Sequence, residues 1–250
     1  MPATDGALLG TWARSTFDAA GLTREVYRKG SGPVVIVVHE IPGITPAVLR
    51  FAEDVVSAGF TVAMPNLVGT PGRDVSGKYL ASSMLKVCIS REFTNLATNR
   101  TSPVIAWLRA LARKLHTEVG GKGVGAVGMC FSGGFALGMM VDDIMVAPVL
   151  SQPSMPFAIG KNRAADLNLS PDDAAVVAQR AAEGCQVLGL RFTGDKLVGD
   201  RFSALRELIG DAFVAIELPS RDPKDHSVLT EQRDEESVQR VLSFFAEKLK

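Results

Sequence analysis

The chain has 250 residues, a formal net charge of zero and 46% hydrophobic residues, which suits a globular protein with a substantial core. Lys and Arg are interspersed with Asp and Glu, so no basic stripe indicates a nucleic-acid partner, and no apolar run approaches the roughly 20 residues of a membrane span. Residues 1–10 lack a signal-peptide layout, and three scattered cysteines suit neither a disulfide framework nor a zinc site. We therefore expect a reducing cytoplasm and no membrane partner.

The first predicted elements are a strand, a helix and a second strand. Residues 34–38 (VVIVV) form a continuous apolar run, typical of a strand buried on both faces of a parallel sheet. A Thr-Pro pair at 45–46 supplies an N-cap and a first-turn proline, and an apolar stripe continues to a stop at Gly59. Residues 60–64 form the next strand. The segment 65–101 is long and polar, with scattered Gly, Pro and Asn.

The remainder of the chain continues the alternation. We expect, in order, a helix from a Ser-Pro cap at 102–103 to Leu115, a strand over 124–129, a helix over 133–140, a strand over 144–149, a helix from Ser170 to Gly184, a strand over 188–193, a helix over 202–209, a strand over 213–218 and a helix from about 236 onward. This order predicts an α/β fold with a mostly parallel central sheet and helices on both faces. We expect a single domain over residues 1–250 with insertions at about 65–101 and 150–169. Connections this long tend to act as lids or walls of a site, with surface decoration as the alternative.

The strand over 124–129 runs directly into the pattern of a nucleophile elbow, Gly128-Met129-Cys130-Phe131-Ser132. A nucleophile on a sharp strand-to-helix turn needs small residues two positions before and two after it. Gly128 and Ser132 meet this requirement around Cys130, although a buried core cysteine is the alternative. Ser132 is a second hydroxyl nucleophile type, but Cys130 rather than glycine stands two residues before it. Cys130 is therefore the preferred nucleophile.

A base and an acid follow the cysteine in the chain. His226 lies in the loop after the last predicted strand, whereas His39 closes the first strand and is expected to be a buried structural residue. Asp195 follows the strand over 188–193, at the sheet edge where α/β proteins form their sites. The order Cys130, Asp195, His226 is the nucleophile, acid and base order of α/β-hydrolases. Asp200 competes as the acid, but its position suits the N-cap of the next helix.

The end of the first strand supplies a candidate oxyanion loop, His39-Glu40-Ile41-Pro42-Gly43. In α/β-hydrolases this loop gives one backbone N–H to the oxyanion hole, and the residue after the nucleophile gives the other. These donors are the amides of Ile41 and Phe131, because Pro42 has no N–H. No second histidine follows His39 at helical spacing, so a metalloprotease motif is excluded.

With Cys130, Asp195, His226 and the loop at 39–43, the chain resembles the dienelactone hydrolase family of α/β-hydrolases over most of its length. The resemblance implies a carboxylic ester hydrolase that opens a cyclic enol ester, such as a dienelactone, through a thioester acyl-enzyme without cofactor or metal. It also implies that Glu40 holds the resting cysteine protonated and takes its proton when substrate arrives.

Several residues depart from the family pattern. Met129 and Ser132 stand where the family carries a tyrosine or similar residue and a glycine, and residues 227–230 (SVLT) lack the arginine that clamps a substrate carboxylate. Arg91 can supply the family's other carboxylate contact, with a surface pair to Glu92 as the alternative. Another ester, lactone or thioester is therefore as good a substrate as the carboxylated dienelactone.

Other functions stay open at this point. A serine-type esterase that uses Ser132 and a non-catalytic ligand-binding protein with this fold are the alternatives. Glutamine amidotransferases also use a cysteine elbow, but their acid closely follows the histidine, whereas Asp195 precedes His226. The expected partner is a small-molecule ester or lactone.

Overall fold

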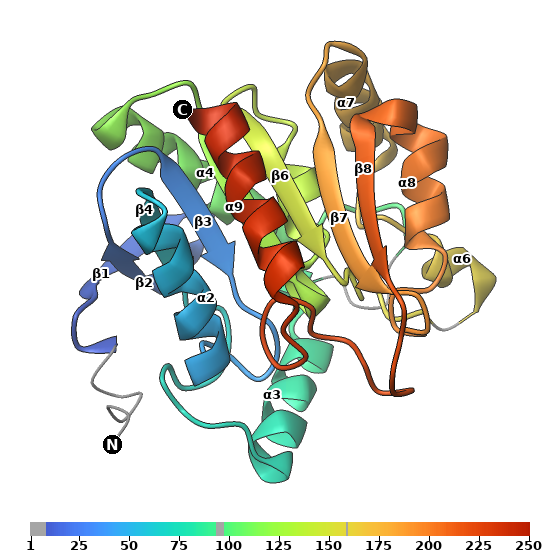
Figure 1. Ribbon diagram of the computed structural model, residues 1–250, viewed down its shortest axis with the longest axis horizontal. Coiled ribbons are helices and arrows are strands. Elements are labelled where there is room, and N and C mark those ends of the chain that lie inside the picture. Colours follow the sequence, from blue (N-terminus) through green and yellow to red (C-terminus); the bar gives the residue numbers. More distant parts are fainter. Residues whose placement is uncertain (1–8, 94–97, 159) are drawn as a thin grey trace.

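The computed structural model describes residues 9–93, 98–158 and 160–250, without the side chains of residues 89 and 91. Eight strands form one sheet in the order β1-β2-β4-β3-β5-β6-β7-β8 (Figure 1). The strands are β1 (Ala13–Ala19), β2 (Leu22–Lys29), β3 (Val34–Val38), β4 (Thr61–Pro65), β5 (Val124–Met129), β6 (Met145–Ser151), β7 (Val187–Phe192) and β8 (Phe213–Leu218). β3 to β8 run parallel to one another, and β1 and β2 extend the sheet antiparallel at one edge. The predicted α/β-hydrolase fold is confirmed.

Helices cover both faces of the sheet. The α-helices are α2 (Pro46–Ser57), α3 (Gly77–Ile89), α4 (Pro103–Val119), α5 (Phe135–Met139), α6 (Lys161–Ala164), α7 (Pro171–Ala182), α8 (Arg201–Ile209) and α9 (Glu235–Leu249), with short 3-10 turns η1 (Arg91–Phe93), η2 (Cys130–Ser132) and η3 (Gly210–Ala212). α2 and α9 lie together on one face, in front of the sheet in Figure 1. None of the described helices is long and apolar enough to cross a membrane.

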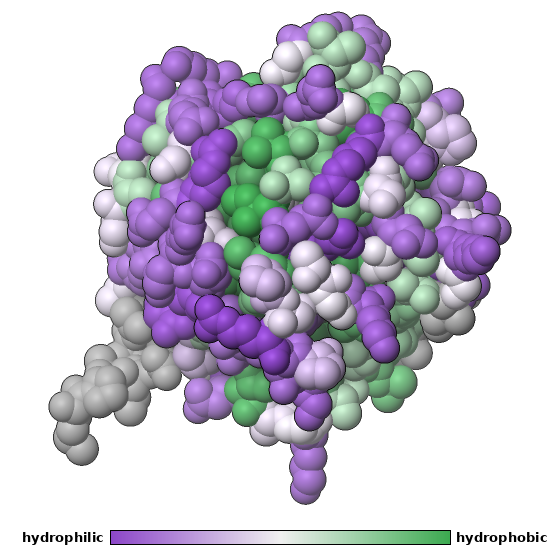
Figure 2. Space-filling model, turned by 45° about the vertical axis from the view of Figure 1, so that its right-hand side comes forward, coloured by the Kyte–Doolittle hydropathy of each residue, from purple (hydrophilic) through white to green (hydrophobic). Residues whose placement is uncertain are grey.

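The alternation of side chains along β3 divides the core into two layers. Val34, Ile36 and Val38 pack into the cluster that contains residues of α4, α5, α7 and α8. Val35 and Val37 point to the opposite face and pack with residues of α2 and α9. All five side chains are fully buried, as expected for a strand covered on both sides. Figure 2 shows one outer side of the molecule, where hydrophilic residues surround a smaller hydrophobic area.

Three differences from the predicted elements stand out. β1 and β2 were not predicted and form a hairpin whose two-residue turn, Ala20-Gly21, has positive φ at both positions, as a type I′ turn requires. The helix expected over 133–140 is shorter: η2 begins at Cys130 itself and α5 covers only Phe135–Met139. The first insertion contains a helix of its own, α3.

Candidate active site

The candidate catalytic residues come together at the carboxyl edge of the parallel strands. Cys130 follows β5 directly, and Glu40 lies two residues beyond the end of β3. Asp195 lies in the loop after β7, and His226 lies in the connection between β8 and α9. Because parallel strands place their carboxyl ends on the same edge, residues nearly 190 positions apart in sequence come into contact.

The backbone around Cys130 has the geometry of a nucleophile elbow. Cys130 has a φ of 55°, a left-handed conformation that is uncommon for a residue with a side chain. Its carbonyl accepts hydrogen bonds from the amides of Gly133, at 2.9 Å, and Ser154, at 3.0 Å. A Cβ at Gly128 would lie 2.0 Å from the Ser132 carbonyl oxygen, so only glycine fits there. These contacts hold the half-buried Cys130 at the tip of the turn.

Ser132 has a structural place in the same turn. Its side chain is fully buried, and its Oγ accepts a hydrogen bond from the amide of Met129 at 3.0 Å. The carbonyl oxygens of Val38 and His39 lie 3.1 and 3.0 Å from the same Oγ. The hydroxyl therefore ties the elbow to the end of β3 and has no exposed surface from which to attack a substrate.

Buried Asp195 and half-buried His226 form an acid and base pair. The Oδ2 atom of Asp195 lies 2.6 Å from Nδ1 of His226, and its Oδ1 accepts from the amide of Leu197 at 3.0 Å. The backbone amides of His226 and Ser227 both donate to Oε1 of Gln232, at 3.3 and 2.8 Å. The structure thus brings Asp195, and not Asp200, to the imidazole, with a tight loop behind it.

The charge state of His226 follows from its neighbours. Burial acts to lower its pKa, but the electrostatic interaction with Cys130 and the hydrogen bond with Asp195 outweigh burial and raise the pKa to about 11. Nε2 is buried and makes no well-formed hydrogen bond within the described part of the chain. Cys130 and Asp195, which flank the imidazole in the predicted triad, therefore both favour its protonated form.

His39 orients the predicted oxyanion loop. Its Nδ1 donates to the Glu40 carbonyl at 2.8 Å, and its Nε2 accepts from the amide of Leu67 at 3.0 Å. Burial lowers the pKa of His39 to about 4, so the ring is neutral and this tautomer is defined. In a trans peptide the N–H points opposite to the C=O, so the Ile41 amide faces away from His39. The prediction of a buried structural histidine is confirmed.

The second predicted oxyanion donor lies at the start of a helical turn. Phe131 is the second residue of η2, where backbone amides have no acceptor within the turn. Its ring is buried and packs against Phe93, Phe135 and His39, with ring centroids 5.5, 5.9 and 5.8 Å away. This packing fixes the residue that follows Cys130.

Glu40 is buried and hydrogen-bonded on both oxygens. Oε1 accepts from the Thr230 hydroxyl, and Oε2 accepts from Ser227 Oγ at 2.8 Å and from Gln152 Nε2 at 3.2 Å. Burial raises the pKa of Glu40, and the hydroxyls of Thr230 and Ser227 oppose this shift. Sequence reasoning missed Gln152. Its position just after an apolar strand was the only sequence feature that pointed to the site; in the structure it follows β6 directly and has a φ of 36°.

The structure does not test the predicted contact of Arg91. Its backbone belongs to η1, and its side chain lies outside the described residues. Both carboxylate oxygens of the neighbouring Glu92 accept from Arg24, at 2.7 and 2.6 Å. The arginine contact to a substrate carboxylate therefore stays a prediction.

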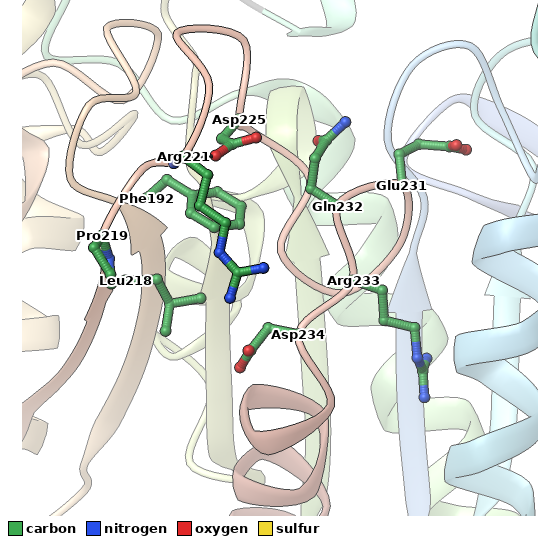
Figure 3. A pocket seen from close by; sticks show the side chains of 9 residues that line it. All are labelled: Phe192, Leu218, Pro219, Arg221, Asp225, Glu231, Gln232, Arg233 and Asp234. Atoms are coloured by element: carbon green, nitrogen blue, oxygen red, sulfur yellow. Dashed lines mark hydrogen bonds between the residues drawn. The ribbon is translucent and has the colours of Figure 1, made fainter.

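A separate cavity of about 370 Å³ borders the loop that carries His226. Figure 3 shows it between β8, the loop and the start of α9, with Arg221 and Asp234 pointing into it. Neither Cys130 nor Asp195 is among its lining residues, so this cavity is not where the predicted nucleophile meets a substrate.

The fold and this arrangement at the strand ends define an α/β-hydrolase. The family model of the dienelactone hydrolase family matches residues 22–153, just over half of the chain, and the chain belongs to that family. It is thus a carboxylic ester hydrolase. No sequence among the curated proteins matches the chain.

Solved structures share the fold at low sequence identity. The dienelactone hydrolase from Anabaena variabilis is 14% identical with a TM-score of 0.63, covering 96% of this chain and 98% of that one. An esterase from Pyrococcus furiosus is 13% identical with a TM-score of 0.64, covering 99% of this chain and 96% of that one. A cold-adapted esterase from an Arctic intertidal metagenomic library is 16% identical with a TM-score of 0.60 over 95% and 93% of the two chains.

Proposed function

We propose that this protein hydrolyses lactones or esters with Cys130 as nucleophile, through a thioester acyl-enzyme. The proposal is carried by geometry: Cys130 lies in a left-handed turn directly after β5, and Oδ2 of Asp195 lies 2.6 Å from Nδ1 of His226. Cys130 attacks, His226 moves protons, and Asp195 fixes the imidazole tautomer through Nδ1. The left-handed backbone at Cys130 supports this assignment, because strained residues of this kind cluster at functional sites.

The reaction divides into acylation and deacylation. The Cys130 thiolate attacks the ester carbonyl, and the amides of Ile41 and Phe131 stabilise the resulting oxyanion; loss of either donor costs about a hundredfold in rate. Collapse breaks the C–O bond of the ester, and the leaving oxygen takes a proton from the His226 imidazolium. His226 then removes a proton from water, which attacks the thioester carbonyl and releases the acid and the thiolate.

The substrate class we infer is an ester or lactone without a required carboxylate. Residues 227–230 contain no arginine, and the hydroxyls of Ser227 and Thr230 donate to Glu40. A guanidinium clamp of the family type therefore has no counterpart at these positions. The three free cysteines support a reducing cytoplasm as the location, since a catalytic thiol must stay reduced there.

Paired substitutions in the elbow test the nucleophile. Cys130→Ala is expected to abolish turnover of an aryl ester, whereas Ser132→Ala retains most of the activity and loses thermal stability, because the Met129 amide is left without its acceptor. Cys88→Ala, on the exposed side of α3, is the matched thiol control.

The opposite pattern would make the protein a serine hydrolase. Full retention of activity in both variants would mean that the reaction takes place at another site. Absence of turnover of any ester by the native chain would favour the ligand-binding alternative. Iodoacetamide gives an independent check on an active protein: inactivation that substrate prevents is expected only of an enzyme with a catalytic thiol.

A further inference from the structure

Glu40 stands at the centre of a buried polar network that connects three strand ends. The exposed fractions are 3% for Glu40, 7% for Ser227 and 0% for both Thr230 and Gln152. Gln152, after β6, donates to Glu40 through Nε2 and accepts from Ser151 through Oε1. Three donors from two other segments therefore converge on one carboxyl group at the end of β3.

Two of these donors belong to the loop that carries the catalytic base. Ser227 follows His226 directly, and the Ser227 carbonyl accepts from the amides of Thr230 and Gln232, at 3.3 and 3.0 Å. Oε1 of Gln232 in turn accepts a hydrogen bond from the amide of His226. Residues 226–232 thus form one tight turn, and Glu40 links this turn to the sheet through two hydroxyls.

We propose that Glu40 is a positioning residue for His226, which acts by fixing the turn 226–232 through the Ser227 and Thr230 hydroxyls. This inference rests on the proposed role of His226 as the base. It differs from a role in which Glu40 itself takes the proton of Cys130. The hydrogen bonds of Glu40 go to Thr230, Ser227 and Gln152, so both of its oxygens are directed at the scaffold of the base.

The physical basis is the cost of a mobile base. Asp195 holds one side of the imidazole through Nδ1, but the backbone of His226 needs its own anchor. Without the Thr230 hydroxyl, Oε1 of Glu40 loses its partner, and without the Ser227 hydroxyl, Oε2 keeps only Gln152. In either case the turn loses one link to Glu40 and gains freedom to shift. Misplacement of a catalytic group by about 1 Å can cost about a hundredfold in rate.

The test compares Ser227→Ala, Thr230→Val and Glu40→Gln. All three are expected to lower kcat for an aryl ester by about 10-fold to about 100-fold with little change in KM, because the base is misplaced while substrate binding persists. All three are also expected to slow alkylation of Cys130 by iodoacetamide at neutral pH, since the displaced imidazolium no longer stabilises the thiolate. The double variant Glu40→Gln/Thr230→Val should lose no more than the worse single variant, because both changes break the same link.

Two control variants separate position from general stability. Thr230→Ser keeps the hydroxyl and is expected to recover most of the activity that Thr230→Val loses. Thr61→Val removes another buried hydroxyl, which donates to the Gly32 carbonyl at the start of β4. It should reduce thermal stability without lowering the kcat of the folded protein.

Each remaining outcome is decisive. If only Glu40→Gln loses activity while Ser227→Ala and Thr230→Val resemble the parent, Glu40 is a proton acceptor and the positioning role is wrong. If all three melt earlier but keep their kcat and alkylation rate, the network is structural only. Failure of the proposed function is recognised separately, because Cys130→Ala would then keep its turnover.

Discussion

At the residue scale, the difference between a hydroxyl and a guanidinium beside His226 decides what the site can recognise. Thr230 and Ser227 are short, neutral and directed at Glu40. A guanidinium would carry a positive charge and five donors, which suits a substrate carboxylate. Residues 227 and 230 therefore place hydroxyls against the buried acid Glu40, whereas a clamp for a carboxylate would need a cation there.

A panel of esters and lactones, matched in leaving group and differing in one carboxylate, tests this consequence. We expect kcat/KM values that do not favour the carboxylated member, because residues 227–230 offer it no cation. A preference of about tenfold or more for the carboxylated substrate would indicate a charge-assisted clamp elsewhere and contradict this expectation.

Whether a site residue can be predicted from the sequence depends on whether the neighbouring residues in the chain indicate its position. Cys130, Asp195 and His226 could be chosen from chain order, because each follows a recognisable strand. Gln152 and Thr230 could not, since their role exists only where the ends of β3 and β6 meet the loop after β8. No pattern within either segment indicates that meeting.

At the element scale, the end of β3 is coupled to the segment after β4 through His39. Its ring bridges the Glu40 carbonyl and the amides of Leu67 and Val68. Protonation of Nε2 would remove the acceptor for both amides. The apolar run of β3 predicted the strand correctly, but the contacts of the residue after it depend on the neighbouring strand.

This coupling predicts a stability change with pH. The pKa of His39 is about 4 in the folded protein, below its ordinary value of 6.5. Between pH 6.5 and 4, His39 therefore binds a proton in the unfolded chain but not in the folded chain. The free energy of unfolding should fall by about 3 kcal/mol as the pH is lowered across this range. The raised pKa of His226 acts in a different window: its contribution is full below pH 6.5 and is lost as the pH rises towards 11.

Urea unfolding of the native chain and of His39→Asn at several pH values measures the effect. The side-chain amide of asparagine can still donate to the Glu40 carbonyl, so the variant should fold while its stability varies less between pH 4 and 6.5. The same slope in both proteins would show that His39 is not the group responsible.

At the scale of the whole molecule, one buried arginine joins the second insertion to the acid loop. Arg201, at the start of α8, is 1% exposed. Its guanidinium donates to six backbone carbonyls, those of Met155, Pro156, Arg163, Asp166, Leu197 and Val198. Burial lowers its pKa to about 10, so the charge persists at neutral pH. The second insertion and the loop of Asp195 thus share one anchor.

The parts of the fold that sequence could not supply are its edge and its insertions. Buried parallel strands have an unmistakable apolar signal, whereas β1 is mostly exposed and polar along its length. Its partner β2 alternates only weakly, so the hairpin is recognisable chiefly by its Ala20-Gly21 turn. α3 similarly begins without an acidic first turn and carries the exposed Leu80 and Leu85.

The role of Cys130 as nucleophile is tested most directly by identifying the residue that carries the acyl group. A slowly deacylating ester should be mixed with the native chain, quenched in acid and analysed by peptide mass spectrometry. We predict an added acyl mass on Cys130, lost in Cys130→Ala and retained in Ser132→Ala. An acyl group on Ser132, or turnover with no acyl group on Cys130 at any time, would contradict it.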